Sequence, residues 1–371
     1  VGGQLVALAG LGHAVGLLAV SRDLERFDRA IGVRLRAAGV RVWLVPAGGF
    51  AGELLRIAKQ LRRLAAGGAV HCAYVRGIWG ALAIALSGRR VPYVYDVRGS
   101  LKDEMVASGT ARYKRWLYLA LERWSIRRAR SVSAVSRPLA AMVSHEYGRS
   151  AVSVVPCCVD VEVTAASAAA VADRRAELGY QDECVLVYSG GLSHYQQVPA
   201  MLAIWRALRD DPNVRFLLLT NEDPHKAPQQ VGDLADFGSR LRHLSLPHTE
   251  VALTLAAADI GFMLRDAREL NRVASPVKFP EYLGAGLAVV GSPHTGDASD
   301  YIAEFDVGAL ADPGNLDQAV AAVRVLIARW RTDRNGFRQR GPALVAQRYD
   351  WRAYRDTFRA HYGKPRAARA H

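Results

Sequence analysis

The chain has 371 residues, of which 50% are hydrophobic and 23% are charged. That length exceeds one ordinary core and fits two domains, and the composition excludes a disordered or fibrous protein. No apolar run reaches the ~18 residues that would cross a bilayer, and the four cysteines have neither zinc spacing nor a disulfide pattern, so a reduced, cytoplasmic setting is expected.

The net charge of +14 is concentrated in the N-terminal part of the chain. Residues 1–150 contain 24 Lys and Arg against 9 Asp and Glu, whereas residues 151–371 contain 25 against 26. This asymmetry indicates an anionic partner for the first part: a membrane surface, a phosphorylated acceptor or a nucleic acid. An arginine-rich protein with a well-solvated surface would explain part of the same excess.

Residues 1–160 alternate short apolar runs with helical patterns, which is typical of a doubly wound α/β domain with parallel strands. After the opening Val1-Gly2-Gly3-Gln4, the pattern predicts a helix over residues 5–11. Strands are expected over residues 14–20, 40–46, 70–75, 91–97, 132–135 and 152–155.

The fourth of these strands ends in Asp96-Val97-Arg98-Gly99. Ligands of open α/β sheets bind at the carboxyl ends of the strands, so both charged side chains are candidates for a binding cleft. Asp96 could orient an acceptor hydroxyl, and Arg98 could contact a phosphate or an acidic acceptor. A structural Asp–Arg pair that holds the loop is the alternative.

A basic amphipathic pattern covers residues 111–130. A helix of this kind with tryptophan can lie in an anionic membrane interface, although a surface helix that buries an apolar stripe gives the same pattern more often. Nucleic acid is disfavoured because no recognition module accompanies the segment. The basic residues are Arg112, Lys114, Arg115, Arg123, Arg127 and Arg128, and the apolar ones are Trp116, Leu117, Leu121 and Trp124.

A second α/β alternation occupies residues 161–348, with strands expected over residues 184–188, 214–220, 241–244, 259–263 and 287–290. Its first strand runs into Gly190-Gly191, followed by Ser193 and His194. Glycines let backbone N–H groups approach a phosphate closely, which favours a phosphate-binding turn at the head of this domain. A plain tight turn is the alternative. A final helix is expected over about 349–363.

Lys278 and Glu281 stand three residues apart at the start of a helix-like segment. A helix N-terminus attracts phosphate, and Lys278 adds a full charge there. Glu281, one turn on, can accept hydrogen bonds from ribose hydroxyls. The combination predicts a site for a nucleoside diphosphate; a surface lysine with a capping glutamate is the alternative.

The run Ser275-Pro276-Val277-Lys278-Phe279-Pro280-Glu281-Tyr282-Leu283 resembles the S-P-x-K-x-x-E-Y-L segment of one subgroup of family 4 (group 1) glycosyltransferases. The Gly190-Gly191 turn and the Asp96-Val97-Arg98-Gly99 element resemble two further landmarks of that family, in the family's order. The chain departs from the family pattern at four places: Gly284 for alanine, Ala288 for proline, Val273 for an earlier glutamate, and Gln196 with Gln197 for a loop lysine.

The resemblance implies the GT-B fold, in which two Rossmann-like doubly wound domains face a cleft. The domain of residues 1–160 would take the acceptor, joined by the returning helix, and the domain of residues 161–348 would bind the donor. GT-B first domains begin with a strand before a glycine loop, so the first strand is expected to be missing here, and Gly2 and Gly3 would belong to that loop.

By resemblance, the chain is a retaining, hexosyltransferase-type enzyme that moves a sugar from a nucleotide-diphosphate sugar to an acceptor hydroxyl, without a metal or other cofactor. The departing phosphate would take the acceptor's proton. The implied catalytic residues are Asp96, Arg98 and Lys278, and the implied donor-binding residues are Gly190, Gly191, Ser193, His194, Arg272, Ser275, Lys278, Glu281 and Tyr282.

Two alternatives stay open. A nucleotide-sugar epimerase of the same fold would bind the donor without a second substrate, and a non-catalytic pseudoenzyme or partner subunit would fit the departures at Val273 and Gln196. The basic first domain leaves a lipid-linked or anionic acceptor open, with peripheral contact at the inner face of the membrane. Polysaccharide or glycoconjugate biosynthesis is the corresponding hypothesis.

Overall fold

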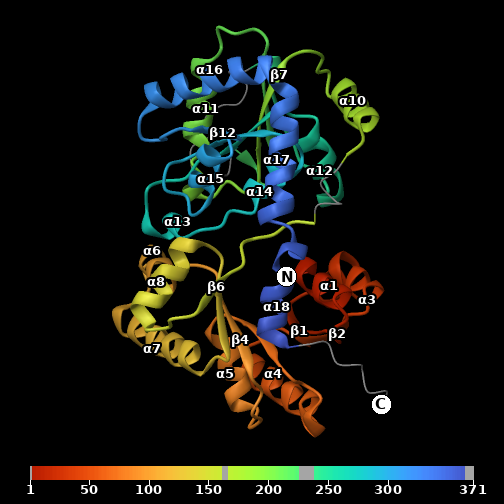
Figure 1. Cartoon of the computed structure of the whole chain (residues 1–371), viewed down its shortest axis with the longest axis vertical. Coiled ribbons are helices and arrows are strands. Elements are labelled where there is room, and N and C mark those ends of the chain that lie inside the picture. Colours follow the sequence, from red (N-terminus) through yellow and green to blue (C-terminus); the bar gives the residue numbers. More distant parts are fainter. Residues whose placement is uncertain (1, 161–165, 225–237, 364–371) are drawn as a thin grey trace. The chain divides into compact units, whose positions relative to one another are not determined.

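The computed structural model describes residues 2–160, 166–224 and 238–363. They divide into two compact units, each built of parallel strands and helices (Figure 1). Unit 1 comprises the described residues up to Cys158 together with those from Trp351 onward, and unit 2 is Val159–Asp350. Each unit has the Rossmann-like alternation that the sequence pattern predicts.

The strands of unit 1 form two separate parallel sheets among the described residues. One pairs β1 (Gly16–Ser21) with β2 (Arg41–Pro46). The other has the order β3-β4-β5-β6, with β3 (Ala73–Arg76), β4 (Tyr93–Val97), β5 (Ser131–Ala134) and β6 (Val152–Val154). All six strands lie within a few residues of the predicted ranges because each is a short apolar run bounded by turn residues.

The helical elements of unit 1 lie before, between and after these strands. They are α1 (Gly2–Gly10), α2 (Leu24–Phe27), the π-helical η1 (Asp28–Gly32), α3 (Val33–Ala37), α4 (Phe50–Leu64), the 3₁₀ turn η2 (Ala66–Gly68), α5 (Ile78–Leu86), α6 (Leu101–Ala107), α7 (Arg112–Arg128), α8 (Arg137–Tyr147), the 3₁₀ turn η6 (Trp351–Tyr354) and α18 (Arg355–Tyr362).

Gly2 and Gly3 are not in a loop, contrary to the prediction. Both belong to the first turn of α1, and a Cβ on Gly3 would lie 2.6 Å from Nε1 of Trp351. The absence of a side chain at Gly3 therefore serves close packing of α1 against Trp351. Gly3 thus fits a helix–aromatic contact within unit 1, and the prediction of a glycine loop at this point is wrong.

The last helix returns to unit 1 and completes its core. Phe358 of α18 is 1% exposed and packs with Leu8 of α1 and Val155, which follows β6. The His361 ring nitrogen Nε2 lies 3.1 Å from the Ser153 hydroxyl oxygen. Residues from the two ends of the chain thus share one small hydrophobic cluster.

In the described part of unit 2 the strands form one six-stranded parallel sheet with the order β12-β11-β10-β7-β8-β9. The strands are β7 (Cys184–Ser189), β8 (Val214–Leu219), β9 (Leu241–Leu244), β10 (Ile260–Met263), β11 (Ala288–Gly291) and β12 (Gly308–Leu310). The chain moves outward from β7 in one direction and then from β10 in the other, so the topological switch point lies between these two strands.

The helical elements of unit 2 connect these strands. They are α10 (Ala168–Glu177), the 3₁₀ turn η3 (His194–Gln196), α11 (Val198–Ala207), α12 (His248–Ala256), α13 (Glu269–Arg272), α14 (Lys278–Gly284), α15 (Ala298–Glu304), α16 (Leu316–Thr332) and α17 (Arg334–Arg348).

Both faces of the unit 2 sheet are buried, which is why its strands read as continuous apolar runs. Along β7, Leu186 and Tyr188 join the core on one face, whereas Val185 and Val187 join the core on the other. This period-2 division fixes the register, since a slip of one residue would exchange the two sets. The carboxyl end of β7 is thereby held in one position.

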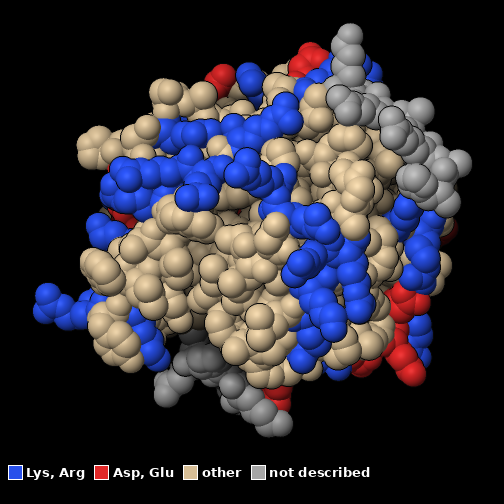
Figure 2. Space-filling model, turned by 90° about the horizontal axis from the view of Figure 1, so that it is seen from below, with Lys and Arg blue, Asp and Glu red and all other residues tan. Residues whose placement is uncertain are grey.

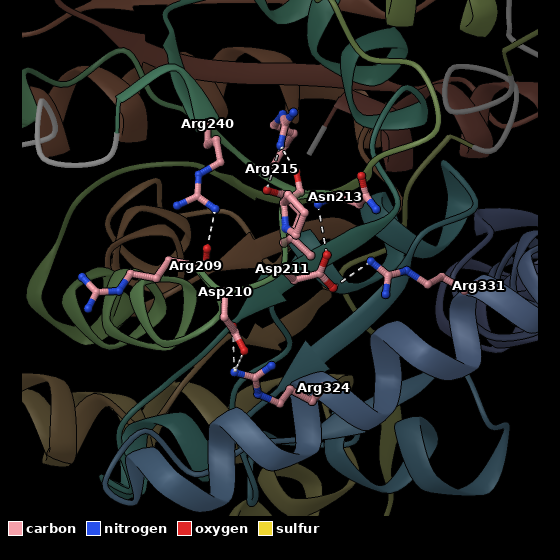
Figure 3. Close-up of polar contacts among 10 residues, drawn as sticks. Arg209, Asp210, Asp211, Asn213, Arg215, Arg240, Arg324 and Arg331 are labelled. Carbon is pink, nitrogen blue, oxygen red and sulfur yellow. Dashed lines mark hydrogen bonds and ion pairs between the residues drawn. The ribbon is translucent and has the colours of Figure 1, made fainter.

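The amino edge of the same sheet is held by surface ion pairs (Figure 3). In the turn before β8, Asp210 accepts from Arg324 at 2.9 Å and Asp211 accepts from Arg331 at 2.8 Å, both arginines being on α16. Arg240 donates to the backbone oxygen of Arg209 at 2.7 Å. Exposed pairs of this kind contribute little energy singly, and they lie at the edge opposite to the carboxyl ends of the strands.

Candidate functional site

The candidate site lies at the carboxyl edge of the unit 2 sheet, at the switch point between β7 and β10. Gly190 is the residue after β7, Arg265 lies two residues after β10, and Lys278 is the first residue of α14. Open α/β sheets bind ligands at such a switch point because the loops diverge there and leave room. Strand pairing between β7 and β10 therefore brings together segments that are far apart in the sequence.

Lys278 is 9% exposed, although it has a full ammonium group. Its Nζ donates to Oε1 of Gln196 at 3.1 Å and lies 5.3 Å from the centroid of the Tyr188 ring. The pKa of Lys278 is lowered to about 8, mainly by burial and also by the nearby Arg265, while Glu281 opposes the shift. An ammonium held in this way is poorly solvated and gains strongly from an added anion.

Gly190 is required where it stands. Its φ of 140° is a conformation that residues with a side chain rarely adopt. A Cβ at this position would lie 2.6 Å from Cε and 2.7 Å from Nζ of Lys278. The glycine therefore leaves the space that the lysine head group occupies, so two of the predicted donor-binding residues meet directly.

Arg265 was not predicted from the sequence, and it is the second cation of the site. It is 8% exposed, its guanidinium lies 4.8 Å from the centroid of the Tyr195 ring, and its backbone N–H donates to the Ser292 hydroxyl at 2.8 Å. Among the described residues its buried Nε has no hydrogen-bond partner. Burial lowers the pKa of Arg265, and the guanidinium in turn lowers the pKa of Lys278.

Two cations thus lie buried near each other, and across residues 2–160, 166–224 and 238–363 neither makes an ion pair within 4.0 Å. Like charges in a poorly solvated site repel, and each is costly unless a counter-charge arrives. We refer to Lys278 and Arg265 as the cation pair. Its arrangement suits an anion of two or more negative charges, such as a diphosphate.

Glu281 and Tyr282 lie one turn further along α14. Burial raises the pKa of Glu281, against the opposing effect of Lys278. Tyr282 is fully buried, and its hydroxyl accepts a hydrogen bond from the Ser189 backbone N–H at 2.9 Å. Tyr282 therefore supports the end of β7 from inside the core, whereas the half-buried Glu281 is the polar member of this turn.

The other predicted residues of unit 2 are spread around this centre. Gly191 is half-buried, and a Cβ there would lie 2.6 Å from Oε1 of Glu222. His194 begins η3, and Ser193 and Ser275 are half-buried in the adjoining loops. Arg272 lies 3.4 Å from the Glu269 carboxylate with 42% of its side chain exposed, so it does not join the cation pair.

A hollow of about 320 Å³ adjoins the glycine turn beyond the ends of β8 and β9. Glu222 links the two, because its carboxylate accepts from the Leu192 backbone N–H at 2.8 Å and also lines the hollow. The remaining lining residues are Thr220, Asn221, Asp223, Pro224, His243 and Ser245.

In unit 1 the predicted Asp96 is buried beneath the loop that it was expected to serve. It is 2% exposed, its Oδ1 accepts from the Ser133 hydroxyl at 3.0 Å, and its Oδ2 lies 3.5 Å from Nη1 of Arg98 and 3.9 Å from Nε of Arg76. Burial raises the pKa of Asp96, and Arg98 is the largest opposing influence. The carboxylate therefore orients Arg98, whose Nη2 lies 2.9 Å from the Cys157 sulfur.

Neither a metal cluster nor a bilayer-spanning helix is found in the part of the chain that the structure describes. No three His, Cys, Asp or Glu side chains there are grouped so that they could share an ion. No described helix combines the length and hydropathy needed to cross a membrane.

Comparison with known proteins finds matches to the chain both in sequence and in fold. Residues 5–163 match the family model described as Glycosyltransferase Family 4. The 2-deoxystreptamine glucosyltransferase of Streptomyces kanamyceticus is 25% identical over 257 residues, which is 67% of this chain and 65% of that enzyme. The comparison thus spans somewhat less than two thirds of the curated relative's length.

Solved structures resemble the chain over nearly its whole length. A glycosyltransferase from Rickettsia africae has a TM-score of 0.73 at 12% identity, covering 97% of this chain and 93% of the other. Sucrose-phosphate synthase from Thermosynechococcus elongatus has a TM-score of 0.70 at 14% identity, covering 94% of this chain and 98% of the other. Anabaena HepE in complex with UDP has a TM-score of 0.70 at 18% identity, covering 96% of this chain and 95% of the other. The predicted fold class, GT-B with two Rossmann-like units, is confirmed.

Proposed function

We propose that this chain, a member of the family 4 (group 1) glycosyltransferases, transfers a sugar from a nucleotide-diphosphate sugar to an acceptor hydroxyl with retention at the anomeric carbon. The reaction would be of the hexosyltransferase type and would use no metal ion. Unit 2 would bind the donor, and unit 1 would take the acceptor.

The observation that carries this proposal is the cation pair. A diphosphate placed against Lys278 and Arg265 would neutralise both buried charges at once. Gly190 leaves the room that the Lys278 head group occupies at this edge, since no Cβ covers the position. The structures of Anabaena HepE with UDP and with UDP-glucose support the same class of donor by analogy of fold.

The chemistry follows from where negative charge develops. The bond between the anomeric carbon and the donor phosphate oxygen breaks, and the acceptor oxygen forms its bond to the same face of the sugar. The departing diphosphate oxygen takes the acceptor's proton. Lys278 and Arg265 would stabilise the charge on that oxygen, and preorganised cations in a poorly solvated site are suited to this task. Glu281 would accept hydrogen bonds from the ribose.

Arg98 in unit 1 is proposed to contact the donor phosphate or an acidic acceptor, with Asp96 as its positioning residue. The carboxylate is too enclosed to meet a substrate while it accepts from Ser133, but it fixes the guanidinium beside it. The proposed acceptor is lipid-linked or otherwise anionic, and it is supported by the excess of Lys and Arg in residues 1–150.

The test is a thermal-shift screen of UDP, GDP, ADP and TDP with their sugar conjugates, on wild type and on Lys278→Met. We expect one nucleotide to raise the melting temperature of wild type and not that of Lys278→Met. Wild type should also release sugar slowly from the sugar conjugate of that nucleotide. Conversion of UDP-GlcNAc alone to an epimer would instead favour the epimerase. No shift with any nucleotide, from folded protein, would contradict the donor site and leave a pseudoenzyme.

A further inference from the structure

We propose that unit 1 docks on an anionic lipid surface through an exposed apolar stripe on α7. The α7 stripe consists of Tyr113, Trp116, Leu117 and Ala120. Their spacing of three and four residues places them on one side of the helix. The inference deepens the proposed acceptor class, since it would place the enzyme where lipid-linked acceptors are found, but its evidence comes from unit 1 alone.

The α7 stripe faces away from the core of unit 1. Tyr113 is 71% exposed, Trp116 is 73% exposed and Leu117 is 47% exposed. The opposite side of the same helix is buried through Glu122, Ser125 and Ile126. The core-facing side of α7 is therefore already occupied, and the α7 stripe is a second apolar side with no covering element among the described residues.

Cations border the α7 stripe, and no acidic side chain lies on the exposed surface of the helix. The one acidic residue of α7, Glu122, is 5% exposed. Figure 2 shows Lys and Arg gathered in broad bands over the face seen from below, with Asp and Glu mainly at its edges. The exposed basic residues of α7 are Arg112, Lys114, Arg123, Arg127 and Arg128.

Aromatic contacts join the buried side of α7, through Tyr118, to α5 and α4. The ring centroids of Tyr118 and Trp79 lie 5.5 Å apart, and those of Trp79 and Phe50 lie 4.5 Å apart. Phe50 is 54% exposed, as is Val106 on α6, and Leu55 of α4 is 60% exposed. The exposed basic residues of α4 are Arg56, Lys59, Arg62 and Arg63.

An anionic bilayer surface fits this combination better than other partners. Tryptophan and tyrosine settle at the level of the lipid head groups, aliphatic side chains enter the acyl boundary, and basic residues meet lipid phosphates. A second copy of the chain would bring the cations beside both stripes together, which costs energy. Leu117, Val106 and Leu55 offer nothing to the polar backbone of a nucleic acid.

The experiment measures cosedimentation of the full-length protein with vesicles of equal parts phosphatidylglycerol and phosphatidylcholine, and with vesicles of phosphatidylcholine alone. The double variant Trp116→Ser/Leu117→Ser tests the apolar contact. Its matched control is Leu316→Ser/Val325→Ser on α16 of unit 2, where the two side chains are 45% and 59% exposed. Arg112→Gln/Lys114→Gln tests the charges.

Wild type is expected to bind the anionic vesicles and not the neutral ones. The Trp116→Ser/Leu117→Ser partition coefficient should fall about tenfold or more, and each lost cation should lower it about fivefold, whereas the α16 control should bind as wild type does. The variants should keep the circular dichroism spectrum and the nucleotide-induced thermal shift of wild type, because the α7 stripe is exposed and belongs to unit 1.

Failure of wild type to bind anionic vesicles would overturn the inference, as would equal losses in the α7 and α16 variants. If the Trp116→Ser/Leu117→Ser variant lost self-association and not lipid binding, the α7 stripe would be a contact between copies of the chain, and the inference would be wrong. Binding to vesicles without any nucleotide-induced shift would contradict the proposed donor site and leave this inference standing. A nucleotide shift without vesicle binding would do the reverse.

Discussion

Replacing Lys278 by Met is expected to stabilise the ligand-free protein and to abolish donor binding. Methionine fills a similar apolar volume without a charge. Lys278 is 9% exposed, and its pKa is lowered from 10.5 to about 8, first by burial and then by Arg265. The wild-type protein therefore keeps a destabilising charge at this position until an anion binds.

The magnitude follows from the pKa shift. Each pKa unit corresponds to about 1.4 kcal/mol, so the buried ammonium lowers the free energy of unfolding by roughly 3 kcal/mol at about pH 7. Loss of the hydrogen bond from Lys278 to Gln196 leaves a buried acceptor, which costs about 1 kcal/mol. The net stabilisation is about 2 kcal/mol, equivalent to a rise in Tm of about 5 °C for a unit of this size.

The effect of pH has a defined sign. Because the folded pKa of Lys278 lies below the unfolded value, the unfolded chain binds more protons between about pH 8 and pH 10.5. The stability of wild type contributed by this group therefore rises with pH through that window. The penalty of the buried charge shrinks to about 1.5 kcal/mol near pH 9.5, and the advantage of Lys278→Met should shrink with it.

Urea unfolding of wild type and Lys278→Met at about pH 7 and about pH 9.5 measures both quantities. Lys59→Met is the control, because Lys59 is exposed on α4 and its replacement should change stability by less than about 0.5 kcal/mol. A loss of more than about 1 kcal/mol in Lys278→Met at pH 7, or a difference from wild type that stays constant with pH, would refute the reasoning.

Three further predictions concern single residues. Arg265→Gln should lower the donor kcat/KM about 10²-fold; an unchanged value in a steady-state transfer assay would remove Arg265 from the site. Gly190→Ala should lower the free energy of unfolding by more than Gly39→Ala does. Gly39 also has a positive φ, of 77°, but open space around its Cβ position, so its replacement should cost only about 1 kcal/mol of backbone strain. Equal losses of the two variants in urea unfolding would disprove the steric contact of Gly190 with Lys278. Burial raises the pKa of Glu122 to about 7, so the folded state holds this proton more tightly and stability falls as pH rises from about 4.5 to 7. The Tyr147 hydroxyl donates a hydrogen bond to the Glu122 carboxylate and can also donate to an amide oxygen. Glu122→Gln should therefore flatten that dependence in melts at about pH 5 and pH 8.

The strands were predictable because the signal for each of them, an uninterrupted apolar run, is contained in a few consecutive residues. Apolar runs such as Val185–Val187 are buried on both faces of the unit 2 sheet, and that burial leaves a continuous hydrophobic signal in the sequence. β12 (Gly308–Leu310) was missed because three residues are too few to establish a period. The close approach of Gly3 to Trp351 was missed because the sequence does not place these two residues side by side.

The site was predictable only in part because its cations meet through strand pairing. Lys278 and Gly190 each stand in a recognisable local motif, and the structure brings them together. Arg265 stands in no motif, and its neighbours Asp266 and Arg268 give the stretch the look of a charged surface loop. The signal that could have identified it is its position just past an apolar strand, at the edge where ligands bind. The burial of Asp96 depends on Ser133, a partner in another strand.

The return of α18 to unit 1 determines the order in which the chain can fold as it leaves the ribosome. Unit 2 is continuous in sequence, and its first and last residues, Val159 and Asp350, form a parallel bridge. Phe358 is made only after all of unit 2, so until then Leu8 and Val155 lack the residue that packs against them. Most of unit 1 is synthesised before unit 2, yet unit 1 is completed after it and stays exposed to chaperones and proteases until α18 has been made.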